Sequence, residues 1–457
     1  MKTVVKKNDL VEITIEDIGS DGEGIGKYQG YTLFVKDTTV GDRAVVKVIK
    51  TGKTYGFARL MELVKPSEYR VEPRCPIASK CGGCQLQHMD YAKQLEYKEN
   101  KVRNCLTRIG GFCDIPMEPI CGMEEPYYYR NKSQFPVGKR RDGGVAIGFY
   151  AGRTHSIIDT EHCYIGARVN TDILRFMRSF IEQYHIEPYE EETHQGLLRH
   201  ILTRVGYRTG EVMVCLVVNG RDIPHKEELI KGLRAIPGMK SICLNVNRSK
   251  TNVILGEAIV PLWGEPYITD YIGDIAYRIS PLSFYQVNPV QTKKLYDIAL
   301  LYADLHGDEV VWDLYCGIGT ISLFLAQKAK MVYGVEIIPQ AIEDAKRNAQ
   351  INSIKNAEFF VGAAEEVLPA KYQEENIHAD VIVVDPPRKG CAQSLLDTIL
   401  KMAPKKVVYV SCDPATLARD LKYLCEKDYE LVKVRAVDQF SHSVHVESVA
   451  RIERVKA

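Results

Sequence analysis

Alternating apolar and polar residues indicate that the first 65 positions of the chain form a series of strands. The segments DLVEITIEDIG, YTLFVK and DRAVVKVIKTGKTYGFARLMEL alternate with a period of two, and the glycines of GSDGEGIGKYQG interrupt them. This period is typical of half-buried strands that are separated by tight turns. The pattern predicts a five-stranded barrel of the OB type over residues 1–65, an architecture that often binds nucleic acid.

A second pattern, in which apolar strands alternate with helices, begins near residue 308. EVVWDLY, MVYGVEI, AEFFVG, ADVIVVD and KVVYVS are almost wholly apolar, and each is followed by a helical stretch. Strands that are apolar on both faces are typical of a mostly parallel sheet covered by helices on both sides. We therefore expect an α/β, Rossmann-like domain over residues 276–457.

The region between these two patterns, residues 66–275, has no single period. Residues 66–90 are rich in proline, glycine and cysteine and predict a linker or a cofactor loop. Residues 91–110 predict a basic helix, and the remainder mixes strands, glycine turns and two helical stretches. We expect a mixed central domain here, so the chain as a whole is predicted to have three parts.

Composition excludes several classes of protein. The 457 residues carry a formal net charge of +1, so any electrostatic attraction to nucleic acid must be local. No run approaches the roughly 20 apolar residues of a membrane span, and MKTVVKKNDL has no apolar signal core. We expect a cytoplasmic protein whose thiols stay reduced, so its 13 cysteines serve metal binding, catalysis or packing.

Four polar side chains follow strands of the C-terminal region: Asp313, Glu336, Asp385 and Cys412. The carboxyl ends of parallel strands meet at one edge of an open sheet, which is where ligands bind. Glu336 is placed to accept both hydroxyl groups of a ribose, beside the glycine turn of DLYCGIGTISL. The third glycine of the dinucleotide fingerprint is missing, and so is a phosphate-binding lysine loop. The pattern therefore favours S-adenosylmethionine, with an ordinary tight turn as the alternative.

Cys412 lies at the exit of a strand in YVSCDPATLARD rather than inside it. A small apolar residue that packs at the strand end is one interpretation. Its place on the ligand-binding edge, next to the strand exit VDPPRKG, favours a nucleophile instead.

A separate group of cysteines lies in RCPIASKCGGCQLQH. Cys75, Cys81 and Cys84 follow the spacing C-x5-C-x2-C, and Cys163 is a fourth candidate further along the chain. Four thiolates hold either zinc or a [4Fe–4S] cluster, and the spacing does not separate the two. Unliganded cysteines are the remaining alternative.

Aromatic and basic residues occur together in three segments, 127–135 (YYYRNKSQF), 139–144 (KRRDGG) and 199–208 (RHILTRVGYR). Aromatic rings stack on unpaired bases while arginines bind phosphates, so these segments predict nucleic-acid contacts without separating RNA from DNA. Buried tyrosines beside surface arginines are the alternative. The predicted barrel has a basic side of its own, formed by Lys47, Lys50, Lys53 and Arg59.

Five motifs in order resemble the bacterial RNA 5-methyluridine methyltransferases: SFYQVNP (283–289), DLYCGIGT, DPPRKG, YVSCDPATLARD and FSHSVHVE (440–447). The resemblance spans nearly the whole chain and implies a TRAM barrel, an iron–sulfur segment, a central domain and a methyltransferase domain. It implies that S-adenosylmethionine is bound by Gln286, Tyr315, Glu336 and Asp385. By the same resemblance Cys412 is the nucleophile, Glu447 is the base, and the four cysteines hold a [4Fe–4S] cluster rather than zinc.

The implied reaction is methylation of carbon 5 of specific uridines in 23S ribosomal RNA through a covalent cysteine–uracil adduct. A thiolate that adds to carbon 6 makes carbon 5 nucleophilic, and a base then removes the carbon 5 proton. This chemistry predicts an environment that lowers the pKa of the Cys412 thiol. Two positions depart from the family pattern, since Asp413 replaces asparagine and Ser441 replaces proline.

Other functions remain open at this point. A transfer RNA target is the second candidate, although the transfer RNA branch of the family typically lacks the cysteine segment. Amino methylation of adenine would use the Asp-Pro-Pro loop without a cysteine, and a non-enzymatic RNA-binding sensor of redox state or iron would use the cluster alone. The resemblance implies RNA as the partner, and we expect no membrane, no obligate protein partner and a monomer by default.

Overall fold

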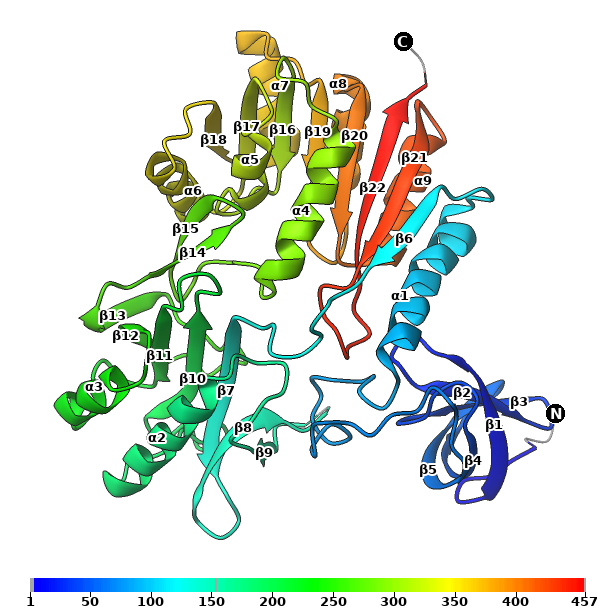
Figure 1. The fold of residues 1–457 in the computed structure, drawn as a ribbon, viewed down its shortest axis with the longest axis vertical. Helices are drawn as coiled ribbons and strands as arrows, with labels where there is room; N and C mark the ends of the chain where they lie inside the picture. The colour runs from blue at the N-terminus through cyan, green and yellow to red at the C-terminus, as the bar shows by residue number, and fades with distance from the viewer. Residues whose placement is uncertain (1–3, 153, 456–457) are drawn as a thin grey trace.

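Five strands close into a barrel, drawn in blue in Figure 1, within a computed structural model that describes residues 4–152 and 154–455. They are β1 (Leu10–Ile18), β2 (Gly24–Tyr28), β3 (Tyr31–Val35), β4 (Arg43–Thr51) and β5 (Tyr55–Lys65). Their order is β1-β2-β3-β5-β4, and β4 closes the barrel by pairing with β1. Alternate residues such as Ile13, Leu33 and Val46 are buried inside it, as the period of two requires. The predicted barrel is confirmed.

A long helix, α1 (Tyr91–Cys105), follows the cysteine segment and continues into a π-helical turn, η1 (Leu106–Gly110). Asp90 caps its start, because one carboxylate oxygen accepts the backbone N–H groups of Ala92 and Lys93 at 2.8 and 3.2 Å. The predicted helix over residues 91–110 is therefore confirmed, with its last turn widened.

The central sheet has seven strands in the order β13-β12-β11-β10-β7-β8-β9. Helices α2 and α3 pack against it, and Phe135, Ile201 and Leu216 are among the fully buried residues between these layers (Figure 1). The elements are α2 (Asn170–Gln183), α3 (Lys226–Arg234), β7 (Lys132–Lys139), β8 (Val145–Tyr150), β9 (Ile157–Asp159), β10 (Leu198–Val205), β11 (Val212–Val218), β12 (Met239–Val246) and β13 (Ala258–Gly264).

A short hairpin links the central sheet to an eight-stranded sheet, whose order is β18-β17-β16-β19-β20-β22-β21-β6. The five strands from β18 to β20 are parallel to one another, while β22 runs antiparallel to β20 and to β21. The predicted α/β, Rossmann-like fold is therefore confirmed. The strands are β14 (Ile268–Ile272) and β15 (Ile275–Ile279) of the hairpin, and β6 (Met117–Cys121), β16 (Val310–Leu314), β17 (Met331–Glu336), β18 (Ala357–Val361), β19 (Val381–Val384), β20 (Lys406–Ser411), β21 (Tyr429–Val437) and β22 (Glu447–Arg454) of the sheet.

Helices cover both faces of this sheet, as its apolar strands require, and two separate hydrophobic clusters fill the two interfaces. The helices are α4 (Pro289–Ala303), α5 (Thr320–Leu325), α6 (Pro339–Ile351), α7 (Ala364–Glu375), α8 (Gln393–Met402) and α9 (Pro414–Cys425). The strand order reverses between β16 and β19, so the connections from these two strands diverge and leave a crevice at their carboxyl ends.

One strand of the eight comes from far away in the sequence. β6 precedes the whole central sheet, yet it pairs in parallel with β21, with Val434 opposite Met117 and Val437 opposite Cys121. In Figure 1 it lies beside α1 at the edge of the C-terminal sheet. The segment 66–275 therefore contributes to the sheet of the segment 276–457.

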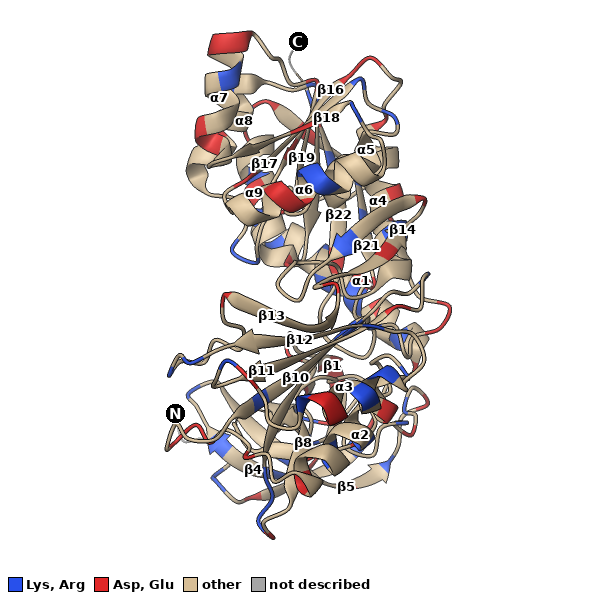
Figure 2. Ribbon diagram, turned by 90° about the vertical axis from the view of Figure 1, so that its left-hand side faces the viewer, with Lys and Arg blue, Asp and Glu red and all other residues tan. Residues whose placement is uncertain are grey.

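Lysine and arginine residues are interspersed with aspartate and glutamate over both sheets, as Figure 2 shows in a view turned by 90°. This mixture agrees with the net charge of +1. Across residues 4–152 and 154–455, no helix combines the length and the apolar character that crossing a membrane requires.

Candidate active site

A cavity of about 1310 Å³ opens at the reversal point of the eight-stranded sheet. Its walls include all six residues predicted for the donor site and the reaction: Gln286, Tyr315, Glu336, Asp385, Cys412 and Glu447. They come together because β16, β17, β19 and β20 end at one edge, while antiparallel β22 begins there with Glu447. The individual roles of these residues stay predictions.

The turn after β16 fixes one wall of the cavity. The backbone N–H groups of Tyr315 and Cys316 both donate to the carbonyl of Val335 at 3.0 Å. Gly319 has a φ of +79°, and a Cβ at this position would lie 3.1 Å from the ring of Phe359 and 3.2 Å from Ala345. The turn therefore depends on glycine for both its backbone angle and its close packing.

The Glu336 carboxylate is held against this turn. Its two oxygens accept the backbone N–H groups of Gly317 at 3.3 Å and Ile338 at 3.1 Å. Behind it, Asp313 is fully buried, and its Oδ1 atom has no hydrogen-bond partner among the described residues. A buried acceptor without a partner at a cavity wall is what a ligand with N–H or O–H donors would satisfy, so these residues fit S-adenosylmethionine.

Three carboxyl groups of the cavity influence one another. Burial raises the pKa of Asp313 to about 7, although a hydrogen bond from Ser322 opposes the shift. Burial, followed by the charge of Asp313, raises the pKa of Asp385 to about 7. Burial, followed by the charge of Asp385, raises the pKa of Glu447 to about 8, and Arg388 opposes this shift. Burial therefore moves the pKa values of all three carboxyl groups upward, toward neutral pH.

Cys412 lies in the same cavity and is partly exposed. Burial raises the pKa of its thiol to about 12, the charges of Glu447 and Asp385 act in the same direction, and Arg388 opposes them. The prediction of a lowered thiol pKa is therefore wrong. The physical reason is that the thiol shares a desolvated cavity with two carboxyl groups.

The two departures from the family motifs have structural roles. Asp413 caps α9, since its Oδ1 accepts the backbone N–H groups of Ala415 at 2.9 Å and Thr416 at 3.2 Å. Ser441 is fully buried, and its hydroxyl donates to the carbonyl of Pro126. Neither side chain is among the residues that line the cavity.

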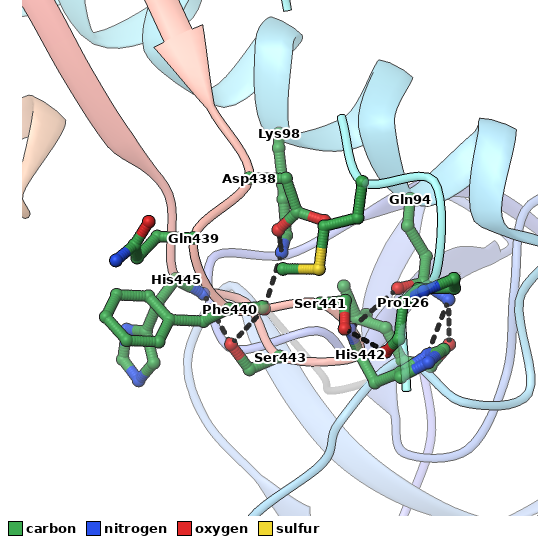
Figure 3. Close-up of polar contacts among 12 residues, drawn as sticks. Gln94, Lys98, Pro126, Asp438, Gln439, Phe440, Ser441, His442, Ser443 and His445 are labelled. Carbon is green, nitrogen blue, oxygen red and sulfur yellow. Dashed lines mark hydrogen bonds and ion pairs between the residues drawn. The ribbon is translucent and has the colours of Figure 1, made fainter. Parts of the chain in front are cut away.

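The loop between β21 and β22, residues 438–446, runs through the view of Figure 3, and two of its residues, Phe440 and His445, line the cavity together with Glu447. The rings of Phe440 and His445 both line the cavity and meet edge to face, 6.3 Å apart. Burial, followed by the charge of Arg388, lowers the pKa of His445 to about 4, so its imidazole is neutral at pH 7.

Sequence reasoning did not assign a role to several residues of this cavity. Phe284, Phe440 and His445 line it, and Arg388 acts electrostatically on both Cys412 and Glu447. All four lie inside the motifs SFYQVNP, DPPRKG and FSHSVHVE. The motifs therefore contained the signal, but the residue types alone did not show which side chains face the ligand.

The four candidate metal ligands share a neighbourhood. Burial raises the pKa of the Cys84 thiol to about 12, and Cys163, Cys81 and Cys75 each raise it further. Within the described ranges, however, no group of three or more His, Cys, Asp or Glu side chains is arranged to hold a metal ion. The donor chemistry fits a soft metal or a cluster, but the structure does not show the predicted ligand set.

Some residues predicted to contact RNA are buried instead. Arg199 donates to the carbonyls of Asn247 at 3.0 Å and Ser249 at 2.8 Å, and fully buried Arg204 donates to Pro281 at 3.2 Å. The prediction of RNA contacts is wrong for these two arginines, because both are buried and their terminal Nη groups donate to backbone carbonyls.

Comparison with known proteins identifies two sequence families. Residues 90–455 match the tRNA (Uracil-5-)-methyltransferase family, and residues 5–61 match the TRAM domain. An uncharacterized RNA methyltransferase of Halalkalibacterium halodurans is 53% identical over 450 residues, which cover 98% of each chain. Another, from Clostridium tetani, is 52% identical over 446 residues, which cover 97% of this chain and 96% of the relative.

A solved structure is similar over almost the full length. The Pyrococcus abyssi tRNA (uracil-54, C5)-methyltransferase, in complex with S-adenosyl-L-homocysteine, is 30% identical with a TM-score of 0.78. The match covers 97% of this chain and 100% of that one. The similarity therefore includes the barrel, the central sheet and the C-terminal sheet together.

Proposed function

This chain belongs to the tRNA (uracil-5-)-methyltransferase family and is an RNA methyltransferase, and we propose that it methylates carbon 5 of specific uridines in 23S ribosomal RNA. The observation that carries this proposal is one cavity that holds a thiol, Cys412, and a buried carboxyl group, Glu447, next to the glycine turn. Covalent uracil chemistry requires a nucleophile, a base and a methyl donor in one place.

The proposed reaction begins at the sulfur of Cys412. Its thiolate forms a bond to carbon 6 of the uracil, and the electron pair of the double bond becomes available at carbon 5. Carbon 5 then forms a bond to the methyl group of S-adenosylmethionine while the bond from that methyl group to the positively charged sulfur breaks, so that S-adenosylhomocysteine leaves. Glu447 then removes the proton from carbon 5, the double bond forms again, and the bond between sulfur and carbon 6 breaks.

Glu447 is suited to the proton transfer. A base is most effective when its pKa lies near the operating pH, and its value of about 8 meets this condition. Only 4% of the residue is exposed, so water does not compete strongly for the proton. A uridine within a folded RNA has to leave its stack to reach this carboxyl group.

The donor pocket is proposed to lie along the ends of β16, β17 and β19. Glu336 takes the ribose hydroxyl groups, and Asp385 with Gln286 lines the side toward the reacting methyl group. Tyr315 completes the pocket wall from the turn after β16. The unpartnered Oδ1 of Asp313 supports the assignment of a ligand with N–H or O–H donors to this side of the cavity.

Two variants test the chemistry directly. With RNA and labelled methyl donor, Cys412→Ala should lose methylation and retain RNA binding. Glu447→Gln should accumulate a methylated covalent protein–RNA adduct on denaturing gels, because addition and methyl transfer proceed while elimination stops. Cys391→Ala is a matched control, since Cys391 also lines the cavity and plays no part in the scheme. Methylation by the Cys412→Ala protein would falsify the proposal.

The choice of ribosomal RNA rests on the cysteine segment, which the transfer RNA branch of the family typically lacks. The solved relative from Pyrococcus abyssi acts on a tRNA uridine, so transfer RNA is the second candidate. Mass mapping of 5-methyluridine in 23S ribosomal RNA and in transfer RNA from cells without this protein separates the two. A loss confined to transfer RNA would overturn the choice of ribosomal RNA.

We also propose that Cys75, Cys81, Cys84 and Cys163 hold a [4Fe–4S] cluster. The support is that the Cys84 thiol interacts with the other three, because ligating thiolates must gather in one place. We expect the protein purified without oxygen to contain iron and acid-labile sulfide. Both should be lost in Cys84→Ser and kept in Cys105→Ser. Zinc without sulfide would contradict the cluster.

The outer face of the barrel offers a contact surface for the RNA. The rings of Phe34, Tyr55 and Phe57 lie 5.6 to 5.8 Å from one another, and Tyr55 is 47% exposed. Lys50 lies directly opposite Phe57 on the neighbouring strand. Stacked bases typically contribute about 1–3 kcal/mol each, so Tyr55→Ala should weaken RNA binding by about tenfold or more. Leu10→Ala, at an exposed apolar residue of β1, is the control.

A further inference from the structure

One face of α1 is polar and points into the protein rather than toward solvent. Tyr91, Gln94, Lys98 and Lys101 follow spacings of three, four and three residues, which places them on the same side of a helix. Gln94 and Lys98 are completely buried. All four contact the 438–446 loop, as Figure 3 shows for Gln94 and Lys98.

One of these contacts is a buried ion pair. Lys98 Nζ donates to Asp438 Oδ1 at 2.5 Å and to the Phe440 carbonyl at 2.8 Å, and neither charged side chain is exposed. The hydroxyl of Tyr91 donates to the second carboxylate oxygen, Oδ2, at 2.7 Å. A buried ion pair pays a large desolvation penalty and adds little net stability, so its main effect here is to fix geometry.

Two further residues extend the contact along the loop. The Gln94 amide accepts the backbone N–H of His442 at 2.9 Å and also bonds to Nδ1 of the same residue at 3.2 Å. Lys101 Nζ donates to the carbonyl of Val444 at 3.0 Å. The helix thus contacts residues 438, 440, 442 and 444, which are alternate positions of one irregular segment.

The opposite side of this segment faces the reacting groups. Phe440, His445 and Glu447 line the cavity that contains Cys412, and Glu447 follows the loop directly. The helix is itself anchored to the barrel, since the Tyr97 hydroxyl donates to the carbonyl of Gly19 at 3.0 Å. The loop therefore lies between a fixed helix and the cavity. Val437 pairs with Glu447 across β21 and β22, and Asp438 follows Val437 directly, so the Lys98–Asp438 pair holds the end of the strand that supports Glu447.

We propose that Lys98, paired with Asp438, is a positioning residue for the proton abstraction by Glu447. It acts through the loop and touches neither RNA nor methyl donor. This inference rests on the proposed function, because it assigns a structural support to the base of that reaction. A displacement of about 1 Å at a reacting group slows a chemical step by on the order of a hundredfold.

The test compares Lys98→Met with Lys93→Met in the full-length protein. Lys93 lies on the same helix and pairs with Glu96 instead of the loop. With RNA and labelled methyl donor, Lys98→Met should slow elimination by on the order of tenfold to a hundredfold and accumulate the methylated adduct. The KM for the methyl donor should stay unchanged, because the proposed donor pocket lies along the ends of β16, β17 and β19, which the loop does not contain. Lys93→Met should match the wild type.

A double variant separates positioning from stability. Lys98→Met leaves the Asp438 carboxylate buried without its partner, which destabilises the fold, and adding Asp438→Asn removes that charge. The double variant should regain thermal stability and still accumulate the adduct. Recovery of both stability and elimination would overturn the inference, and so would normal elimination by Lys98→Met.

Amide hydrogen exchange tests the same inference without the reaction. Residues 438–446 should lose protection in the double variant and keep it in Lys93→Met, while the strands of the central sheet stay unchanged. Unchanged protection of the loop would overturn the inference. If Glu447→Gln itself forms no adduct, the proposed function fails, and the exchange result still decides whether Lys98 holds the loop.

Discussion

Replacing Glu447 by glutamine tests the electrostatics of the cavity in the absence of RNA. The pKa of this carboxyl group rises from its ordinary 4.5 to about 8, because of burial and then the charge of Asp385. The folded chain therefore binds this proton more tightly than the unfolded chain does. The resulting stabilisation is complete below about pH 4.5 and is lost as the pH rises to about 8.

The size of the effect follows from the two pKa values. Their difference corresponds to about 5 kcal/mol of unfolding free energy, since each pH unit contributes about 1.4 kcal/mol. Glutamine has nearly the same shape and carries no charge. Glu447→Gln should therefore equal the wild type near pH 5 and exceed it by several kcal/mol near pH 9.

Urea unfolding followed by circular dichroism, at intervals between about pH 5 and about pH 9, measures this difference. Glu430→Gln is the matched control, because Glu430 lies exposed on the neighbouring strand β21. Parallel curves for the wild type and Glu447→Gln would refute the reasoning, since they would mean that the carboxyl group titrates alike in the folded and unfolded chains.

Three further predictions concern the cavity and its surroundings. Glu336→Gln should weaken binding of S-adenosylhomocysteine by about 1.5–3 kcal/mol in calorimetry, because a charged acceptor is lost, and unchanged affinity would contradict its role. Asp413→Ala should lower the free energy of unfolding by about 1 kcal/mol while Asp413→Asn keeps the cap, and equal losses would contradict the capping role. Alkylation of Cys412 by iodoacetamide should rise about tenfold per pH unit from about pH 7 to 9, because its pKa is about 12, and a plateau below pH 9 would contradict this. Mass spectrometry of the Cys412 peptide measures the rate, with exposed Cys113 as the internal comparison.

The sequence predicted the position of the cavity, because the hydrophobic pattern of the strands and the order of strands and helices determine where the strands end. Parallel apolar strands place their carboxyl ends at one edge, so Asp313, Glu336, Asp385 and Cys412 had to lie close together. The barrel followed from its period of two for the same reason. Both predictions depend on local pattern, and burial on the expected faces confirmed them.

The electrostatics of the cavity could not be predicted in this way. A sequence shows that Cys412 is near carboxyl groups, but not how far those groups are removed from water. The raised pKa of this thiol depends on desolvation first and on the charges of Glu447 and Asp385 second. Depth of burial is a property of the whole fold, so the expected direction was wrong.

The burial of the polar face of α1 also could not be predicted from the sequence. The pattern of residues 91–110 predicts a basic helix, and basic helices usually face solvent or nucleic acid. Lys98 is buried because its partners, the carboxylate of Asp438 and the carbonyl of Phe440, come from a loop more than 300 residues away. A buried helix face is normally recognised in a sequence by a stripe of apolar residues. The buried face of α1 includes polar residues instead, so the sequence did not reveal it.

The parallel pairing of β6 with β21 has a consequence for how this protein is made. The ribosome synthesises Met117–Cys121 several hundred residues before the partner strand β21. Strand β6 therefore stays unpaired until nearly all of the chain has emerged. Such long-range closure is slow and leaves an exposed strand open to wrong partners in the meantime. Newly synthesised chains should therefore gain activity in one late step, and expression of the C-terminal sheet without β6 should yield aggregates.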